Sequence, residues 1–142
     1  MEAEKKLELH IPNAFGYEKV AMNFAASAAK DMGLSDERIE DLKTSVSEAC
    51  LNAIEHGNKM DASMKVGVIL DVEEMNLHVT VQDAGDEIGP VETPNIDDKV
   101  EGRSGRRGWG IFLIKNLVDE LKFENTPEGG NLVRMIIYLE KQ

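Results

Sequence analysis

Two apolar stripes at helical spacing, each followed by glycine, organise the first sixty residues. In residues 16–32 apolar side chains recur every three or four positions before Gly33, at Tyr17, Val20, Ala21, Phe24 and Ala28. Ser35 is typical of a helix N-cap, and a second stripe follows it as far as Gly57, at Ile39, Leu42, Val46, Cys50 (or Ala49) and Ala53. The pattern predicts two amphipathic helices.

Alternating apolar and polar residues predict the strands. Residues 7–11 alternate before Pro12, which indicates a half-buried strand at a sheet edge, and residues 64–70 and 77–82 indicate an antiparallel hairpin. A long loop rich in glycine and proline follows, and a helix from Trp109 to Leu121 and strands at 122–125 and 132–139, joined by a turn at 127–130, end the chain. This grouping predicts an α+β fold, with a mostly antiparallel sheet and helices on one face.

Length and composition favour one cytoplasmic domain over residues 1–142. The chain is 42% hydrophobic, which suffices for a single core, and its lone cysteine cannot form an internal disulfide. We find neither a leader nor a long uncharged apolar stretch, so we expect no membrane attachment. The net charge of −11 argues against direct binding to nucleic acid.

Glu48 and Asn52 stand one turn apart on the second helix and can therefore reach one ligand together. A carboxylate can accept a proton from an attacking hydroxyl, and an amide oxygen is a hard ligand that suits Mg²⁺. The pair is typical of half of a phosphoryl-transfer site. With Ser45 and His56 it forms a polar flank that either faces solvent or lines a pocket.

Two further segments offer complementary chemistry. Asp83 precedes Gly85 at the end of a predicted strand, where its carboxylate could accept a hydrogen bond from an exocyclic amine; alone, such a sequence is most often a turn. The run from Gly105 to Gly110 precedes a helix, has the glycines of an anion cradle, and contains Arg106 and Arg107. Its spacing differs from that of P-loops and dinucleotide-binding motifs.

These motifs, in this order, resemble those of the GHKL ATPase superfamily. They are Glu-x-x-x-Asn on a long helix, Asp-x-Gly after a hairpin strand, and Gly-x-x-Gly-x-Gly opening a helix. The segment from Glu40 to Ala53 is more narrowly similar to the bacterial anti-sigma-factor serine kinases, which are partner-switching regulators. The resemblance covers nearly the whole chain.

The resemblance implies a two-layer α/β sandwich, the Bergerat ATP-binding fold. It implies that Asn52 holds Mg²⁺, that Asp83 reads adenine, and that the glycine-rich loop closes over the phosphates of ATP as a lid. Glu48 would be the base that activates a serine hydroxyl on an anti-anti-sigma antagonist. The implied nucleotide-binding set is Asn52, Asp83, Gly85, Gly105, Arg106, Gly108, Gly110 and Asn131.

The chain departs from the family pattern in two places. Members commonly carry Gly-x-Gly-Phe-Asp-Pro after the adenine-reading aspartate, whereas Asp86-Glu87-Ile88-Gly89-Pro90 follows Gly85 here. A threonine often begins their last strand, whereas this chain offers Gly130-Asn131. The Asn131 amide has the groups to bind a water or an adenine edge in its place.

Three functions are compatible with this sequence. The first is an ATP-dependent serine kinase that also binds a sigma factor, acting as a homodimer as the resemblance implies. The second is a nucleotide-responsive binding module without efficient phosphoryl transfer, against which the presence of Glu48 argues. The third is a related kinase within a stress-signalling complex, which nothing in the sequence separates from the first.

The remaining chemistry-bearing residues have simpler interpretations. His56 is expected to cap the second helix, whereas His10 and His78 fall on the solvent side of strands. Cys50 is expected to be a small core residue, and Trp109 to pack rather than to stack on a base.

Overall fold

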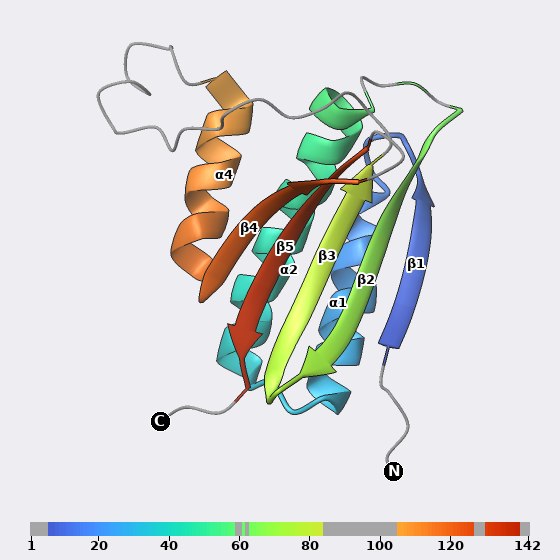
Figure 1. Cartoon of the computed structure of the whole chain (residues 1–142). Coiled ribbons are helices and arrows are strands. Elements are labelled where there is room, and N and C mark those ends of the chain that lie inside the picture. The colour runs from blue at the N-terminus through green and yellow to red at the C-terminus, as the bar shows by residue number, and fades with distance from the viewer. Residues whose placement is uncertain (1–5, 59–60, 62, 84–104, 127–129, 140–142) are drawn as a thin grey trace.

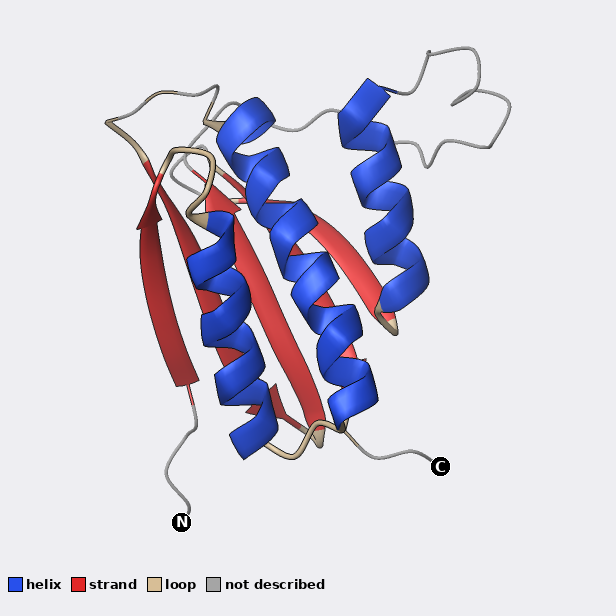
Figure 2. Cartoon of the chain, turned by 180° about the vertical axis from the view of Figure 1, so that it is seen from behind, coloured by secondary structure: helices blue, strands red, loops and turns tan. Residues whose placement is uncertain are grey.

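The computed structural model describes residues 6–58, 61, 63–83, 105–126 and 130–139. Their strands form a sheet of order β1-β2-β3-β5-β4 with antiparallel neighbours: β1 (Lys6–Pro12), β2 (Lys65–Glu73), β3 (Asn76–Asp83), β4 (Glu120–Asn125) and β5 (Asn131–Tyr138). One face is covered by α1 (Glu18–Asp31), α2 (Asp36–Asn52) and α4 (Gly105–Leu117), as Figures 1 and 2 show. The predicted α+β fold is confirmed. Of the helices described, none is long and apolar enough to cross a membrane.

The first helix has a buried face made of small side chains. Its predicted end is confirmed, because Gly33 follows it with φ +105°, a conformation that favours glycine. The expectation that Tyr17 and Val20 belong to the core stripe is wrong, since they are 43% and 48% exposed. The stripe is confirmed at Ala21 and Ala28, which are buried together with Ala25 and Ala29, and at Phe24, which is half-buried against the core.

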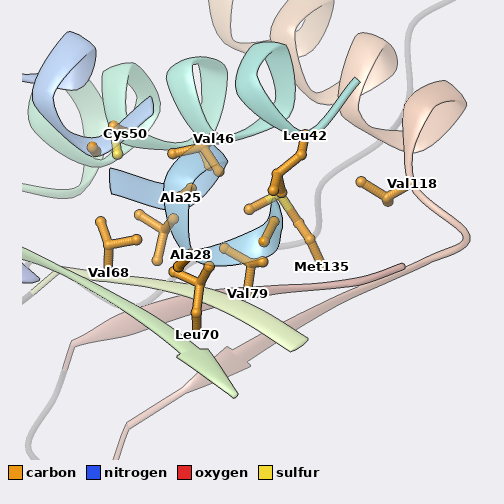
Figure 3. Packing of buried hydrophobic residues seen from close by; sticks show 14 of the residues in the cluster. Ala25, Ala28, Leu42, Val46, Cys50, Val68, Leu70, Val79, Val118 and Met135 are labelled. Carbon is orange, nitrogen blue, oxygen red and sulfur yellow. The ribbon is translucent and has the colours of Figure 1, made fainter. Parts of the chain in front are cut away.

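The second helix carries the centre of the core. Ser35 caps it as predicted, because its Oγ accepts a hydrogen bond from the Arg38 N–H at 3.3 Å. Leu42, Val46 and Cys50 are fully buried, which confirms the predicted stripe. They point toward the strands that carry Val68, Leu70, Val79 and Met135 (Figure 3).

The second helix does not continue to Gly57 in α-helical form. It ends at Asn52 and passes into a π-helix, η1 (Ala53–Gly57). A π-helical turn contains more residues than an α-helical turn, so a 3.6-residue periodicity cannot anticipate it. Ala53, the residue directly after Asn52, is therefore the first residue of the π-helix.

Buried amides hold the end of this π-helix. The Asn58 N–H donates to the Ala53 carbonyl at 2.7 Å, and its side-chain Nδ2 donates to Asn13 Oδ1 and to the Lys65 carbonyl, both at 3.1 Å. Asn13 Nδ2 in turn donates to the Asp61 carbonyl at 3.0 Å. The network joins three segments of the chain: the connection after β1, the end of η1 and the start of β2.

The boundaries of the last helix differ from the prediction at both ends. It begins at Gly105 rather than Trp109, so the glycine motif lies inside the helix. It ends at Leu117, and Leu121 belongs to β4 opposite Met135, because the Asp119 N–H already donates to the Ile136 carbonyl of β5 at 3.0 Å. The predicted loop interior, 84–104, and the turn at 127–129 lie outside the described residues.

We expect Cys50 to make the stability of the fold sensitive to alkaline pH. Burial, with a smaller contribution from the negative charge of Glu18, raises the pKa of its thiol from 9.0 to about 12. Above pH 9 the unfolded chain loses this proton and the folded chain keeps it, so the free energy of unfolding falls as pH rises, by about 1.4 kcal/mol per unit toward pH 12.

Urea unfolding of the native chain and Cys50→Ala at pH 8 and pH 10 measures this effect. Cys50→Ala has no thiol to ionise, so its free energy of unfolding should not fall for this reason. The amount by which the variant is less stable than the native chain should therefore be about 1.4 kcal/mol smaller at pH 10 than at pH 8. If the free energy of unfolding changed equally with pH in the two proteins, Cys50 would not be the source of the effect.

Candidate functional site

Glu48 and Asn52 meet α4 at a glycine. Both side chains are half-buried on α2, and Gly110 of α4 faces them. A Cβ atom at Gly110 would lie 3.3 Å from Glu48 Oε2 and 3.5 Å from Asn52 Nδ2, which is closer to the carboxylate than side chains ordinarily approach. The structure therefore brings together the two halves of the site that the sequence placed almost sixty residues apart.

The first turn of α4 lies just before Gly110. Since the helix begins at Gly105, its first N–H groups lack partners within the helix and carry the positive end of the helix dipole. Such an end binds anions well. Gly108 is half-buried and Gly110 is buried. The structure does not describe the side chain of Arg106, so the role of that side chain stays a prediction.

Asp83 and Asn131 form a buried pair at the end of the sheet. They are register partners on β3 and β5. Asp83 Oδ1 accepts from the backbone N–H of Asn131 at 3.3 Å and from its side-chain Nδ2 at 3.1 Å. Sequence reasoning placed both residues near the same ligand but did not predict this bond, which holds the Asp83 carboxylate in a fixed orientation.

The two groups lie toward the same end of the molecule. Figure 1 shows α2 and β3 running toward that end, where β3 packs against η1. A carboxylate, an amide and a helix N-terminus thus lie on the helix layer, and a buried carboxylate lies at the end of the central strand β3. Gly85, the next expected site residue, is outside the described part of the chain.

Other predicted residues have structural environments. Ser45 is fully buried rather than part of a polar flank, and its Oγ donates to the Asp41 carbonyl at 2.9 Å. His56 is exposed within η1, whereas His78 is half-buried and its Nδ1 has no hydrogen-bond partner among the residues that the structure describes. Trp109 stacks on Phe112 with ring centroids 5.2 Å apart, in line with the expected packing role.

Sequence reasoning missed the amides of Asn13 and Asn58. They matter to the site because they fix η1, which directly follows Asn52. A signal was available, since an asparagine directly after Gly57 is typical of a helix end. The partner from the β1–α1 connection could not be identified without the fold.

Comparison with known proteins identifies relatives over nearly the whole chain. The histidine kinase-like ATPase domain family matches residues 11–137. Serine-protein kinase RsbW of Bacillus subtilis is 34% identical over 144 residues, covering 94% of this chain and 85% of the relative. Serine-protein kinase RsbW of Bacillus licheniformis is 32% identical over 146 residues, covering 96% and 87%.

Solved structures share the fold. The RsbU and RsbW domains of a Mycobacterium tuberculosis protein match with a TM-score of 0.68 at 18% identity, over 94% of this chain and 32% of that longer chain. The SiaB–SiaC complex of Pseudomonas aeruginosa matches with a TM-score of 0.65 at 12% identity, over 92% and 88%. At these identities the likeness concerns the fold alone.

Replacing Gly110 with alanine should separate folding from ligand binding. Alanine favours a helix by about 1 kcal/mol over glycine, so stability should be kept. The added Cβ would displace the Glu48 carboxylate or Asn52 amide, and we expect affinity for ATP–Mg²⁺ to fall about ten-fold. Calorimetric titration measures this affinity, with Asn116→Ala on the exposed side of the same helix as the control. Native affinity in Gly110→Ala would show that the site does not use this approach.

Proposed function

We propose that this chain, which belongs to the family of histidine kinase-like ATPase domains, is an ATP-dependent protein serine kinase that also acts as an anti-sigma factor. Its relatives named serine-protein kinase align over almost all of its length. The observation that carries the proposal is the contact of Gly110 in α4 with Glu48 and Asn52. It supports the proposal because a carboxylate and an amide of α2 lie against the N-terminal half of α4.

The phosphates of ATP would bind between α2 and α4. The Asn52 amide oxygen suits Mg²⁺, which commonly takes one or two protein ligands and completes its shell with phosphate oxygens and water. The N-terminal turn of α4 offers its backbone N–H groups to the phosphates, with Gly105, Gly108 and the Arg106 side chain as further contacts. The missing side chain at Gly110 lets the backbone of α4 approach Glu48 and Asn52 closely.

The adenine end would lie at Asp83. A carboxylate there can accept a hydrogen bond from the exocyclic amine of adenine, which distinguishes it from a base that carries a carbonyl at that position. Asn131 supports this role because its two N–H groups orient the carboxylate. Gly85, which follows Asp83 closely, is proposed to line the same adenine-binding end of the site.

Glu48 would act as the general base of the transfer. ATP–Mg²⁺ supplies the phosphoryl group and an activated leaving group. The Glu48 carboxylate accepts the proton of a serine hydroxyl as the serine oxygen forms its bond to the γ-phosphorus. The bond from that phosphorus to the bridging oxygen breaks, so the products are phosphoserine and ADP, with the proton on Glu48.

The partners proposed for this activity are two proteins. One is an anti-anti-sigma antagonist that presents the acceptor serine, and the other is a sigma factor that the chain sequesters, with both interactions taking place in the cytoplasm and with the chain as a homodimer. A nucleotide-responsive binding module without transfer is the second candidate, because binding needs less exact geometry than transfer does.

Titration with ATP and Mg²⁺ tests the nucleotide site. The native chain should bind, and both Asn52→Ala and Asp83→Asn should bind at least about ten-fold more weakly, since each loses a charged or metal-linked contact. Asn23→Ala on the exposed side of α1 serves as the control and should bind normally. Absence of binding by the native chain would refute the nucleotide-dependent function.

Replacing Glu48 with glutamine tests the transfer step. Glutamine keeps the size but cannot accept the proton, so transfer from γ-labelled ATP to an anti-anti-sigma antagonist should fall about 100-fold or more. ATP affinity should change less than about two-fold. Glu40→Gln, on an exposed position of the same helix, is the matched control. A Glu48→Gln variant that phosphorylates at the native rate would exclude Glu48 as the base.

A further inference from the structure

Arg38 connects the start of α2 to the end of α4. Its Nη1 donates to Asp41 Oδ2 at 2.6 Å and to the carbonyl of Leu117, the last residue of α4, at 2.9 Å. Its Nη2 donates to Asp119 Oδ2 at 3.1 Å. The side chain is only 20% exposed, and a guanidinium at a helix C-terminus is favourable both to the unpaired carbonyl and to the helix dipole.

The same contacts reach the sheet. Asp119 Oδ2 also accepts from the Tyr138 N–H at 2.8 Å, and the Asp119 N–H donates to the Ile136 carbonyl at 3.0 Å. The guanidinium of Arg38 therefore bonds to the end of α4 and to a residue that is itself fixed on β5. A lysine has one ammonium group and cannot reproduce this forked geometry.

A second contact between the helices lies farther along. Arg38 precedes Glu48 on α2, and Gly110 precedes Leu117 on α4, so the two helices run antiparallel and touch near both ends. Gly110 and Leu117 are seven residues apart, or about 10 Å along the helix. Two contacts at this spacing constrain the angle between the helices.

On its other side α4 is packed less tightly. A cavity of about 340 Å³ separates it from β4, lined by Ile111, Lys115, Val118, Asp119, Glu120, Leu121 and Phe123. Figure 2 shows α4 at the edge of the helix layer, with α2 as its neighbour. Ile114 and Val118 pack in the core, and the cavity leaves space beside them, so the contacts with α2 contribute to the angle of α4.

We propose that Arg38 is a positioning residue that sets the angle of α4 against α2 and thereby holds Gly110 and the first turn of α4 at Glu48 and Asn52. A tilt of about 10° about Leu117 would move Gly110 by about 2 Å. A displacement of about 1 Å can reduce catalysis about 100-fold. The effect on ATP rests on the function proposed above, whereas the effect on helix position does not.

The single tryptophan of the chain provides a direct test. Trp109 lies on α4 beside Gly110, so quenching of its fluorescence by acrylamide, measured without nucleotide, reports the position of that end of the helix. Arg38→Met should raise the quenching constant about two-fold. Lys43→Met removes a positive charge from the same helix, where Lys43 pairs with Glu40 at 3.7 Å, and should leave quenching unchanged.

The same variants are then assayed with ATP–Mg²⁺. For Arg38→Met we expect affinity to fall about ten-fold and the rate of ATP turnover to fall about 100-fold, because turnover needs finer geometry than binding. Lys43→Met should match the native chain in both assays. If Arg38→Met does not fold, as judged by circular dichroism, Asp119→Asn replaces it, since it removes the charge and keeps an acceptor for the Tyr138 N–H.

Two results would overturn the proposal. One is native Trp109 quenching in the folded variant, and the other is altered quenching with native affinity and turnover. If the native chain does not bind ATP, the proposed function fails, and the comparison of Trp109 quenching still decides whether Arg38 positions α4.

Discussion

The close approach of α4 to α2 at Gly110 is the constraint on which the rest of the site depends. Glycine inside a helix costs about 1 kcal/mol relative to alanine, and here the lost side chain is what allows the helix to face Glu48 and Asn52. On α2 the fully buried Leu42 and Val46 fix the rotation of the helix. The orientation of the polar pair is therefore a consequence of core packing, so the site rests on a rigid element.

Much of this arrangement could be predicted from the sequence. The 3.6-residue and two-residue periodicities predict every described strand, α1, α2 and most of α4. The spacing of Glu48 and Asn52 predicts that they share one face of α2. These predictions succeed because they depend on local geometry alone. The pairing of Asp83 with Asn131 depends on the register of strands 48 residues apart in sequence, which no local pattern reveals.

The errors have equally physical causes. The prediction begins α4 at Trp109 because Gly105 and Gly108 are typical of a loop, whereas the structure includes both glycines in the helix. Tyr17 and Val20 are predicted to lie in the core because they are hydrophobic, whereas the buried face of α1 consists mainly of alanines such as Ala25. The end of α2 was misjudged because a π-helical turn changes the period itself.

The order of the elements along the chain has a consequence for biosynthesis. Strands β1, β2 and β3 are consecutive neighbours in the sheet, and with α1 and α2 they can pair and cover a core before residue 105 has been synthesised. The contact of Arg38 with Leu117 closes a loop of 79 residues, which costs more entropy than the local contacts and must wait for α4. A ribosome-bound chain can thus begin to form its core while the pair on α2 still lacks its facing helix.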